Sequence, residues 1–475
     1  MSAVLAVDQG TSGTKALVVG DDGAVLGTGE VAVHPRYGEG GAVEQDPAEL
    51  LDSVLAAGRA AIADAGVPVT AVGLANQGES VLAWDRATGE PHTPIVVWQD
   101  KRAAGVAAAR AAYAEELAAL TGLPLDPYFT APKLAWLRER CTRAGVVTTT
   151  DTWLLHRLTG AFVTDAATAS RSLLLDLDRT EWSPRALEIF GLAGEEMPEV
   201  VDCAGPIGGT TAFGGELPVT AAIVDQQAAL YGQGCRAAGQ AKCTYGTGAF
   251  LLANTGEAAV RSGSGLSTSV AWRLSGRAAY CVDAQVYAAA AAVRWLTRLG
   301  VLDGPGRLDA TGATVPDTGG VVFVPALSGL GAPWWRDDAR GAVHGLGLET
   351  EPGHLVRALI EGLAAQIAEL IDTVAHDTAH PPSELRADGG LTRSHLLMQT
   401  QADLAQLPVR VAPTPDATAL GAAALTHLGA SGATGAPPGG AGAASAVYEP
   451  RIGPDEAASR RGAFRALLDR LLEEG

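Results

Sequence analysis

The chain has 475 residues, of which 34 are basic and 53 acidic, and a formal net charge of −19. This length exceeds what one ordinary hydrophobic core supports, so two large domains are expected. The negative charge, with no Lys/Arg-rich run to offset it, argues against binding to nucleic acid or to an anionic membrane surface.

The composition favours a globular enzyme of the cytoplasm. Hydrophobic residues make up 47% of the chain and charged residues 18%, which is typical of a folded domain rather than a disordered one. The five cysteines are odd in number and lack C-x-x-C spacing, so disulfides and a zinc site are not expected. The N-terminus has no basic region of the signal-peptide type, and no apolar segment reaches membrane-spanning length.

The first element is a hairpin with phosphate-binding character. An apolar run at Val4–Val7 leads into a Gly/Thr/Ser turn and a second apolar run at Ala16–Val19. The glycines let the backbone approach a ligand, the turn's N–H and hydroxyl groups can cradle phosphate, and Asp8 could hold a cation through water. The device recurs at Ala241–Leu252. Two such hairpins suggest two related lobes closing on one nucleotide.

The rest of the first half alternates strands and helices. Strands are predicted at Ala24–His34, Val69–Leu74, Val81–Trp84 and Ala221–Val224, and helices at Pro47–Ala65, Ala103–Leu120, Pro132–Arg143 and Thr150–Leu158. The first helix has the clearest signals, with Asp46 as N-cap, Pro47 at the first position and Gly66 as stop.

The second half repeats the alternation. Helices are predicted at Gln285–Leu299, along the apolar positions from Leu355 to Val374, and at Ser394–Gln406, with strands at Val321–Val324 and Leu385–Ala387. This pattern indicates an α/β fold with mixed sheets flanked by helices. We expect an N-terminal lobe at 1–233, a C-terminal lobe at 234–430, and a Gly/Ala/Pro-rich linker with a polar helix at 431–475, with a hinge near Gly232–Gly234.

Common nucleotide-binding fingerprints are missing. None of the four lysines follows glycine as a Walker A motif requires, and no G-x-G-x-x-G opens a helix after a strand. A single Gly/Thr hairpin is more often an ordinary tight turn. Two of them, each near a carboxylate that ends an apolar strand, favour phosphate binding.

Several polar residues at strand ends have two interpretations each. Asp225 ends a buried strand and is either a helix N-cap, the commoner role, or a general base at the mouth of a cleft. Glu79 either accepts hydrogen bonds from substrate hydroxyls or lies in a solvated turn. Trp98 and the Asp126–Phe129 segment are either core packing or a ligand wall.

Two long spaced patterns resemble the signatures of the FGGY carbohydrate kinases. The first covers Tyr128–Glu139, with Lys133, Trp136 and Leu137 in place and Arg140 departing from the usual amide or acid. The second covers Gly341–Leu346, His354–Leu355 and Ala358–Glu361. The resemblance extends from Asp8 to about Leu428, and within the family it is strongest to the members that phosphorylate glycerol.

This resemblance implies two actin-like (ribonuclease H-like) lobes with ATP and Mg²⁺ in the cleft between them. Asp225 would be the catalytic base, and Asp8 and Asp225 would hold Mg²⁺ largely through water. The phosphate and nucleotide contacts would be Thr11, Ser12, Thr14, Gly246, Thr247, Gly389 and Gly390. The polyol pocket would be lined by Gly78, Glu79, Trp98, Tyr128, Asp225, Gln226 and Phe250.

Two further departures from the pattern of the resembled family concern the predicted substrate and nucleotide sites. Gly78 stands where an arginine usually precedes the substrate-binding glutamate, which removes charged donors and opens space. Ala290 and Arg294 stand where Gly and Gln are frequent near the nucleotide. Arg294 either approaches the nucleotide or lies on the helix surface.

The leading hypothesis is therefore an ATP-dependent kinase that phosphorylates a terminal hydroxyl of a small polyol, with glycerol first. A tetritol such as erythritol or a ketopentose such as xylulose are alternatives because of Gly78. An actin-like ATP-binding signalling module is the alternative of another class, and a degenerate kinase that senses sugar is a third. We expect a homo-oligomer in the cytoplasm.

Overall fold

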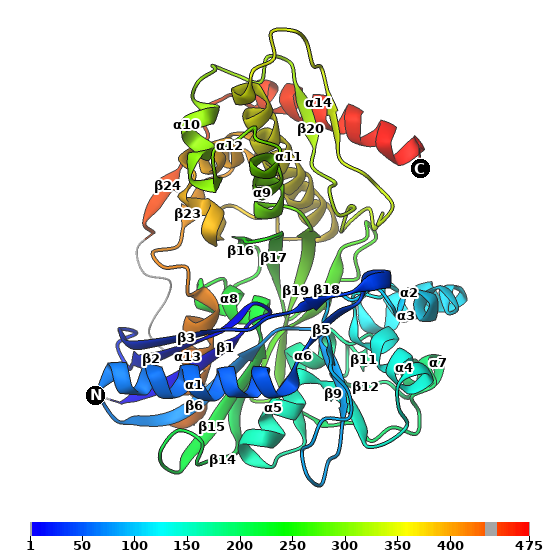
Figure 1. The fold of residues 1–475 in the computed structure, drawn as a ribbon, viewed down its shortest axis with the longest axis vertical. Helices are drawn as coiled ribbons and strands as arrows, with labels where there is room; N and C mark the ends of the chain where they lie inside the picture. The colour runs from blue at the N-terminus through cyan, green and yellow to red at the C-terminus, as the bar shows by residue number, and fades with distance from the viewer. Residues whose placement is uncertain (1, 433–443, 475) are drawn as a thin grey trace.

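The computed structural model describes residues 2–432 and 444–474 and contains two mixed β-sheets, each flanked by helices, stacked along the long axis of the molecule (Figure 1). In spatial order, the six-stranded sheet consists of β14 (Ala204–Thr210), β15 (Leu217–Val224), β6 (Val69–Asn76), β1 (Ala3–Gln9), β2 (Gly13–Gly20) and β3 (Val25–Ala32). The seven-stranded sheet consists of β18 (Ser267–Leu274), β19 (Arg277–Val286), β17 (Ala249–Gly256), β16 (Ala241–Tyr245), β22 (Leu385–Asp388), β23 (Val409–Val411) and β24 (Ala446–Tyr448). The expected α/β class is confirmed.

Smaller sheets and helices surround these two sheets. A five-stranded sheet has the order β4 (Arg36–Tyr37), β5 (Val43–Gln45), β8 (Ile95–Val96), β7 (Val81–Trp84) and β9 (Val146–Thr149). Two-stranded pairs are β10 (Val163–Asp165) with β13 (Glu199–Val201), β11 (Leu175–Asp176) with β12 (Glu181–Trp182), and β20 (Val322–Val324) with β21 (Ala342–His344). The helices are α1 (Pro47–Ala65), α2 (Ala104–Ala108), α3 (Ala114–Thr121), α4 (Thr130–Arg140), α5 (Thr150–Thr159), α6 (Ala166–Ser170), α7 (Pro184–Phe190), α8 (Asp225–Gly232), α9 (Ala290–Arg298), α10 (Leu308–Gly312), α11 (Pro352–Asp377), α12 (His395–Ala405), α13 (Ala417–Ser431) and α14 (Pro454–Glu474).

The same strand arrangement stands at the centre of both large sheets. In the first, β1 pairs antiparallel with β2 and parallel with β6, and β2 continues antiparallel to β3. In the second, β16 pairs antiparallel with β17 and parallel with β22, and β17 continues antiparallel to β19. Both predicted hairpins are thus confirmed, and each occupies the equivalent place in its own sheet.

The apolar run of β1 is explained by burial on both faces of its sheet. Leu5 and Val7 belong to the cluster that contains α1 side chains such as Leu50. The alternate residues Val4 and Ala6 belong to the cluster that contains α13 side chains such as Ala422. Because successive side chains of a strand point to opposite faces, a strand covered by helices on both sides reads as continuous hydrophobicity.

Helix α1 begins and ends where its sequence signals place it. The Asp46 carboxylate accepts hydrogen bonds from the backbone N–H groups of Ala48 and Glu49, and Pro47 occupies the first helical position. Gly66 follows in the left-handed conformation, with φ 61°, and closes the last turn. The helix predicted along Leu355–Val374 is likewise confirmed by α11.

The helix predicted at Gln285–Leu299 is partly wrong. Gln285 and Val286 belong to β19, and the helix α9 begins only at Ala290. Strand β19 pairs with β17 on one side and β18 on the other. This long-range pairing holds Gln285 and Val286 in the strand, and only the alanine-rich stretch that follows forms the helix.

The helix predicted at Ala103–Leu120 is two helices, α2 and α3, separated by a 3-10 turn at Ala111–Tyr113. The break coincides with Arg110, whose guanidinium donates to the carbonyl oxygens of Val106, Ile189 and Phe190. Two of these bonds anchor the chain to the last two residues of α7 at this point.

Most of the predicted C-terminal linker lies outside the described residues, while its terminal helix is confirmed as α14. In the described chain, no helix combines the length and apolar character needed to cross a membrane. All five cysteines are described and none forms a disulfide.

Helix α13 is the late segment of the chain that packs under the six-stranded sheet, and it crosses α8 at very close range. A Cβ atom on Gly421 of α13 would lie 1.9 Å from the carbonyl oxygen of Ala228, and one on Gly232 of α8 would lie 2.1 Å from that of Ala417. The crossing therefore depends on glycine in both helices, and it fixes how α8 lies against α13.

We expect Gly421→Ala to destabilise the fold by roughly 1–3 kcal/mol, because the added methyl group must push two helix backbones apart. The matched control is Gly462→Ala in α14, where no other part of the described chain beyond the adjoining helix backbone lies within 4 Å of the Cβ position. That control should be neutral or slightly stabilising. Thermal unfolding of the two variants beside the parent protein measures the effect, and equal melting temperatures would contradict the close-crossing argument.

Candidate active site

The turn between β1 and β2 is held in shape by bonds to side chains of the first lobe. The Gly10 N–H donates to the Gly13 oxygen at 3.0 Å, which closes the turn. The Gln45 amide donates to the Thr11 carbonyl at 2.6 Å, and the Trp98 indole donates to the Thr11 hydroxyl at 2.9 Å. Thr11 is thereby fixed at the edge of the cleft, next to the exposed Ser12.

Thr14 does not share this position. It lies in β2, where its fully buried hydroxyl shares a 2.7 Å hydrogen bond with Ser53 of α1. This bond directs the side chain into the core and corrects the expected role of Thr14 as a phosphate contact. The hydroxyl residues of the turn itself are Thr11 and Ser12.

The second hairpin is joined to the start of α9 and to the Gly389–Gly390 turn. The carbonyl oxygens of Gly246 and Thr247 accept hydrogen bonds from the N–H groups of residues 289–291. Gly389 has φ 93°, and a Cβ atom there would lie 2.5 Å from the Tyr245 oxygen. The predicted nucleotide residues Gly246, Thr247, Gly389 and Gly390 are thus brought together. Arg294 lies exposed on α9, one turn from its beginning.

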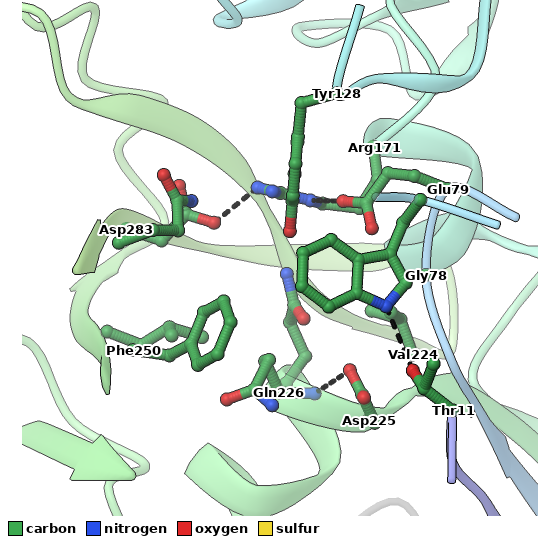
Figure 2. A pocket seen from close by; sticks show the side chains of 14 residues that line it. Thr11, Gly78, Glu79, Tyr128, Arg171, Val224, Asp225, Gln226, Phe250 and Asp283 are labelled. Atoms are coloured by element: carbon green, nitrogen blue, oxygen red, sulfur yellow. Dashed lines mark hydrogen bonds and ion pairs between the residues drawn. The ribbon is translucent and has the colours of Figure 1, made fainter. Parts of the chain in front are cut away.

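A cavity of about 150 Å³ opens between the two large sheets (Figure 2). All residues that the sequence predicts for the polyol pocket line this one cavity. The lining residues are Thr11, Gly78, Glu79, Trp98, Tyr128, Arg171, Val224, Asp225, Gln226 and Gln227 from the first half of the chain, and Phe250, Leu252, Asp283 and Gln285 from the second.

Glu79 is presented to the cavity by a strained turn. It has φ 54°, an uncommon value for a non-glycine residue, and the Ser80 N–H donates across it to the Gly78 oxygen at 2.7 Å. Such strain concentrates at functional sites, where surrounding structure maintains it. The solvated-turn interpretation of Glu79 is wrong, because its side chain is almost completely buried.

Aromatic rings form one wall of the cavity. Tyr128 and Phe250 both contact Trp98 edge-on, with ring centroids 5.6 and 6.4 Å away. The buried Lys133 ammonium holds the Tyr128 loop by donating to the carbonyl oxygens of residues 127–129. Burial lowers the pKa of Lys133 to about 7, so the ammonium depends on these oxygens and on the nearby Glu79.

Asp225 is the first residue of α8, with Val224 in the N-cap position. Its carboxylate accepts a 2.6 Å hydrogen bond from the N–H of Gln226 and otherwise faces the cavity. Burial, and then repulsion from Glu79, raise the pKa of Asp225 to about 6. A carboxylate with a raised pKa in a cleft is well matched to accepting a proton near neutral pH.

Asp8 stands in a group of carboxylates at the end of β1. Burial raises its pKa to about 8, with further contributions from Asp225 and Asp416. Lys15 forms an ion pair with Asp416 and offsets part of this charge. Within the described residues, no three His, Cys, Asp or Glu side chains form a ready metal cage. Mg²⁺ in phosphate sites uses one or two carboxylates plus water and phosphate oxygens, so Asp8 and Asp225 fit it.

The sequence reasoning missed two charged residues of the cavity, Arg171 and Asp283. Arg171 follows α6, and its guanidinium donates to Glu79 at 2.7 Å and to Asp283 (Figure 2). Both residues are buried. The available signal is a lone charge in a stretch of uncharged residues, since charged residues are almost never fully buried unless paired. For Asp283 this signal is weaker, because the segment that follows it has the composition of a helix.

The position of Gly78 in the structure changes its interpretation. A Cβ atom there would lie 3.0 Å from Cγ2 of Val224, which itself lines the cavity. The space beside Gly78 is therefore bounded by Val224, and the guanidinium that lines the cavity is that of Arg171.

Comparison with known proteins gives the same picture over the whole chain. Two family models match: the N-terminal domain of the FGGY family of carbohydrate kinases at residues 3–232, and the C-terminal domain of that family at residues 241–430. Similar proteins include a glycerol kinase of Alkalilimnicola ehrlichii, 42% identical over 99% of this chain and 98% of that protein. A glycerol kinase of Thermus brockianus is 43% identical over 90% of each chain.

Solved structures agree with the arrangement of the two sheets. The crystal structure of Plasmodium falciparum glycerol kinase with ADP superposes with a TM-score of 0.92 at 30% identity, over 99% of this chain and 98% of that one. A xyloylose kinase from Brucella ovis superposes with a TM-score of 0.91 at 26% identity, over the full length of both chains.

The adjacent glycines Gly389 and Gly390 provide a matched test of the contact between their turn and the second hairpin. We expect Gly389→Ala to lower stability by about 1–3 kcal/mol, because the methyl group would meet the Tyr245 backbone and the residue would be strained at positive φ. Gly390→Ala, with no atom within 4 Å, should have little effect. Hydrogen–deuterium exchange should rise at residues 245–248 in the first variant only. Equal exchange in both would show that the two turns are not packed together.

Proposed function

This chain belongs to the FGGY family of carbohydrate kinases, and we propose that it transfers the γ-phosphoryl group of ATP to a terminal hydroxyl of glycerol, giving glycerol 3-phosphate. The observation that carries the proposal is the single cavity that gathers all the predicted polyol residues around Asp225. The glycerol kinases at 42–43% identity and the ADP-bound relative support both substrates.

The size of the cavity suits a three-carbon polyol. A cavity of about 150 Å³ accepts a ligand of about six non-hydrogen atoms, which is the size of glycerol. Val224 bounds the space beside Gly78, which argues against a longer polyol or ketose at that end. The experiment must still distinguish glycerol from the two longer alternatives, erythritol and xylulose.

The charges of the cavity favour a neutral, hydroxyl-rich substrate. Glu79, Asp225 and Asp283 are three carboxylates, against one guanidinium from Arg171. Carboxylates accept hydrogen bonds from hydroxyl groups and repel a carboxylate or phosphate on the substrate. A sugar acid would thus be disfavoured relative to a polyol.

In the proposed mechanism, Asp225 accepts the proton of the attacking hydroxyl, while Glu79 orients the polyol. Thr11 and Ser12 in the first turn, and Gly246 and Thr247 in the second, would contact phosphates, with Gly389 and Gly390 against the adenosine. Asp8 and Asp225 would hold Mg²⁺, which when bound neutralises phosphate charge. Placing the reacting groups between two sheets excludes water as a competing acceptor.

The lobe boundaries fit this division of labour. We propose an N-terminal lobe at 1–233 that carries the polyol and the first phosphate turn, and a C-terminal lobe at 234–430 that carries the nucleotide. The two family models and the two large sheets support this division. A cytoplasmic location and a homo-oligomeric state stay predictions.

The function is tested by ADP release with Mg²⁺-ATP and a panel of glycerol, erythritol, threitol, xylulose, ribulose, gluconate and water alone. We expect kcat/KM to be highest for glycerol and at background for gluconate. Turnover only with four- or five-carbon compounds would show that one of these compounds, and not glycerol, is the substrate. ADP release that is indifferent to every polyol would contradict the kinase proposal and favour an ATP-binding signalling module.

Replacing the proposed base tests the mechanism. Asp225→Asn keeps the shape of the side chain but cannot take up the proton, so kcat should fall about 10²–10⁴-fold. Nucleotide affinity, measured by calorimetry with ADP, should change little. Asp178→Asn, at an exposed ion pair with Arg261, is the control and should turn over normally. Near-normal kcat for Asp225→Asn would refute the base assignment.

A further inference from the structure

Arg171 lines the cavity, and its two ion pairs do not use all of its hydrogen-bond donors. Its Nε donates to Glu79 and its Nη1 to Asp283. Among the described residues that line the cavity, it is the only arginine or lysine. No described residue forms a hydrogen bond with its Nη2, and Nη2 is not one of the completely buried unpaired side-chain atoms, so it keeps some accessible surface. A guanidinium has five N–H donors, so donors remain for a ligand.

We propose that Arg171 is a substrate-contacting, specificity-determining residue, whose free guanidinium N–H groups donate to a hydroxyl of the bound polyol while its other N–H groups hold Glu79 and Asp283. The proposal rests on the proposed function. A polyol hydroxyl both donates and accepts, and the ionised carboxylates around it only accept. Arg171 supplies the charged donor that the cavity otherwise lacks, and charge-assisted hydrogen bonds are the stronger ones.

The guanidinium is held rigidly for such a role. Its centre lies 5.3 Å from the Phe129 ring and 5.9 Å from the Tyr128 ring. Helix α6, which ends immediately before it, is capped by Asp165, whose carboxylate accepts from Ala167 and Thr168. A group fixed by ion pairs, rings and a capped helix loses little entropy when it binds a ligand.

A second observation points to the same end of the cavity. Gln285 is buried, lines the cavity, and its Oε1 has no hydrogen-bond partner among the described residues. Gln285 and Asp283 are two residues apart in β19, so their side chains share one face. A hydroxyl placed there would find an unused acceptor in Gln285 and an unused donor in Arg171.

Arg171 also connects the substrate to both sheets. Glu79 follows β6 of the six-stranded sheet, and Asp283 belongs to β19 of the seven-stranded sheet. A polyol bound to Arg171 is thereby tied to the first half of the chain directly and to the second through Asp283.

The experiment compares Arg171→Lys with the parent protein on glycerol and on the two propanediols, each of which lacks one hydroxyl. We expect kcat/KM for glycerol to fall about 10- to 100-fold, as for loss of a charge-assisted hydrogen bond. For the diol that lacks the hydroxyl bound by Arg171, kcat/KM should fall only a few-fold. If Arg171 had only a structural role, Arg171→Lys would lower kcat/KM equally for all three substrates. That result, or no change in kcat/KM at all, would overturn the proposal.

Two further variants keep the test decisive. Arg102→Lys is the matched control, because Arg102 is also paired with two carboxylates, Asp100 and Glu44, and lies over a ring, that of Trp136, but does not line the cavity. It should leave the substrate ratios unchanged. If Arg171→Lys fails to fold, the double variant Arg171→Gln/Asp283→Asn removes the Arg171–Asp283 ion pair as a unit and leaves the net charge of the group with Glu79 unchanged. The same ratios are measured on it. Failure of the proposed function is distinguishable, because the parent protein itself would then not turn over glycerol.

Discussion

Parallel pairing between three strands is the constraint from which the site follows. Strands β1, β6 and β15 run parallel, and their last residues Gln9, Asn76 and Val224 are in register. The carboxyl ends of parallel strands meet at one edge of a sheet, and ligands bind outside that edge. The phosphate turn, Glu79 and Asp225 are therefore neighbours in space, although Glu79 lies 68 positions after Thr11 and Asp225 lies 146 positions after Glu79.

Much of this arrangement could be predicted, because it depends on local signals. The two hairpins, the capped helix α1 and the strand that ends before Asp225 all follow from apolar runs, turn residues and caps. Thr14 could not be placed in the same way. It is next to the turn in sequence, but the alternation of side chains along β2 directs its hydroxyl to Ser53.

Local sequence signals could not assign Arg171 and Asp283 to the site either. Each belongs to the site only because distant elements meet: α6 brings Arg171 beside Glu79, and the pairing of β19 with β17 brings Asp283 to the same cavity. Helix propensity favours a helix over Gln285–Leu299, whereas strand pairing determines the structure of Gln285. A lone charge in a stretch of uncharged residues is the remaining sequence signal for both residues.

The chain has a net charge of −19, which would repel a negatively charged nucleotide, but positively charged side chains lie around the cleft. The chain has only four lysines, and three of them lie at this site: Lys15 pairs with Asp416, Lys133 holds the Tyr128 loop, and Lys242 donates to Gln226 at 2.6 Å. Because lysine only donates, Lys242 engages the amide oxygen of Gln226 and leaves its NH₂ group for a ligand. These cations, of which Lys133 and Lys242 are buried, thus offset the clustered carboxylates, and Lys242 also orients the neutral donor of Gln226, which suits the cavity to hydroxyl groups rather than to a charged substrate.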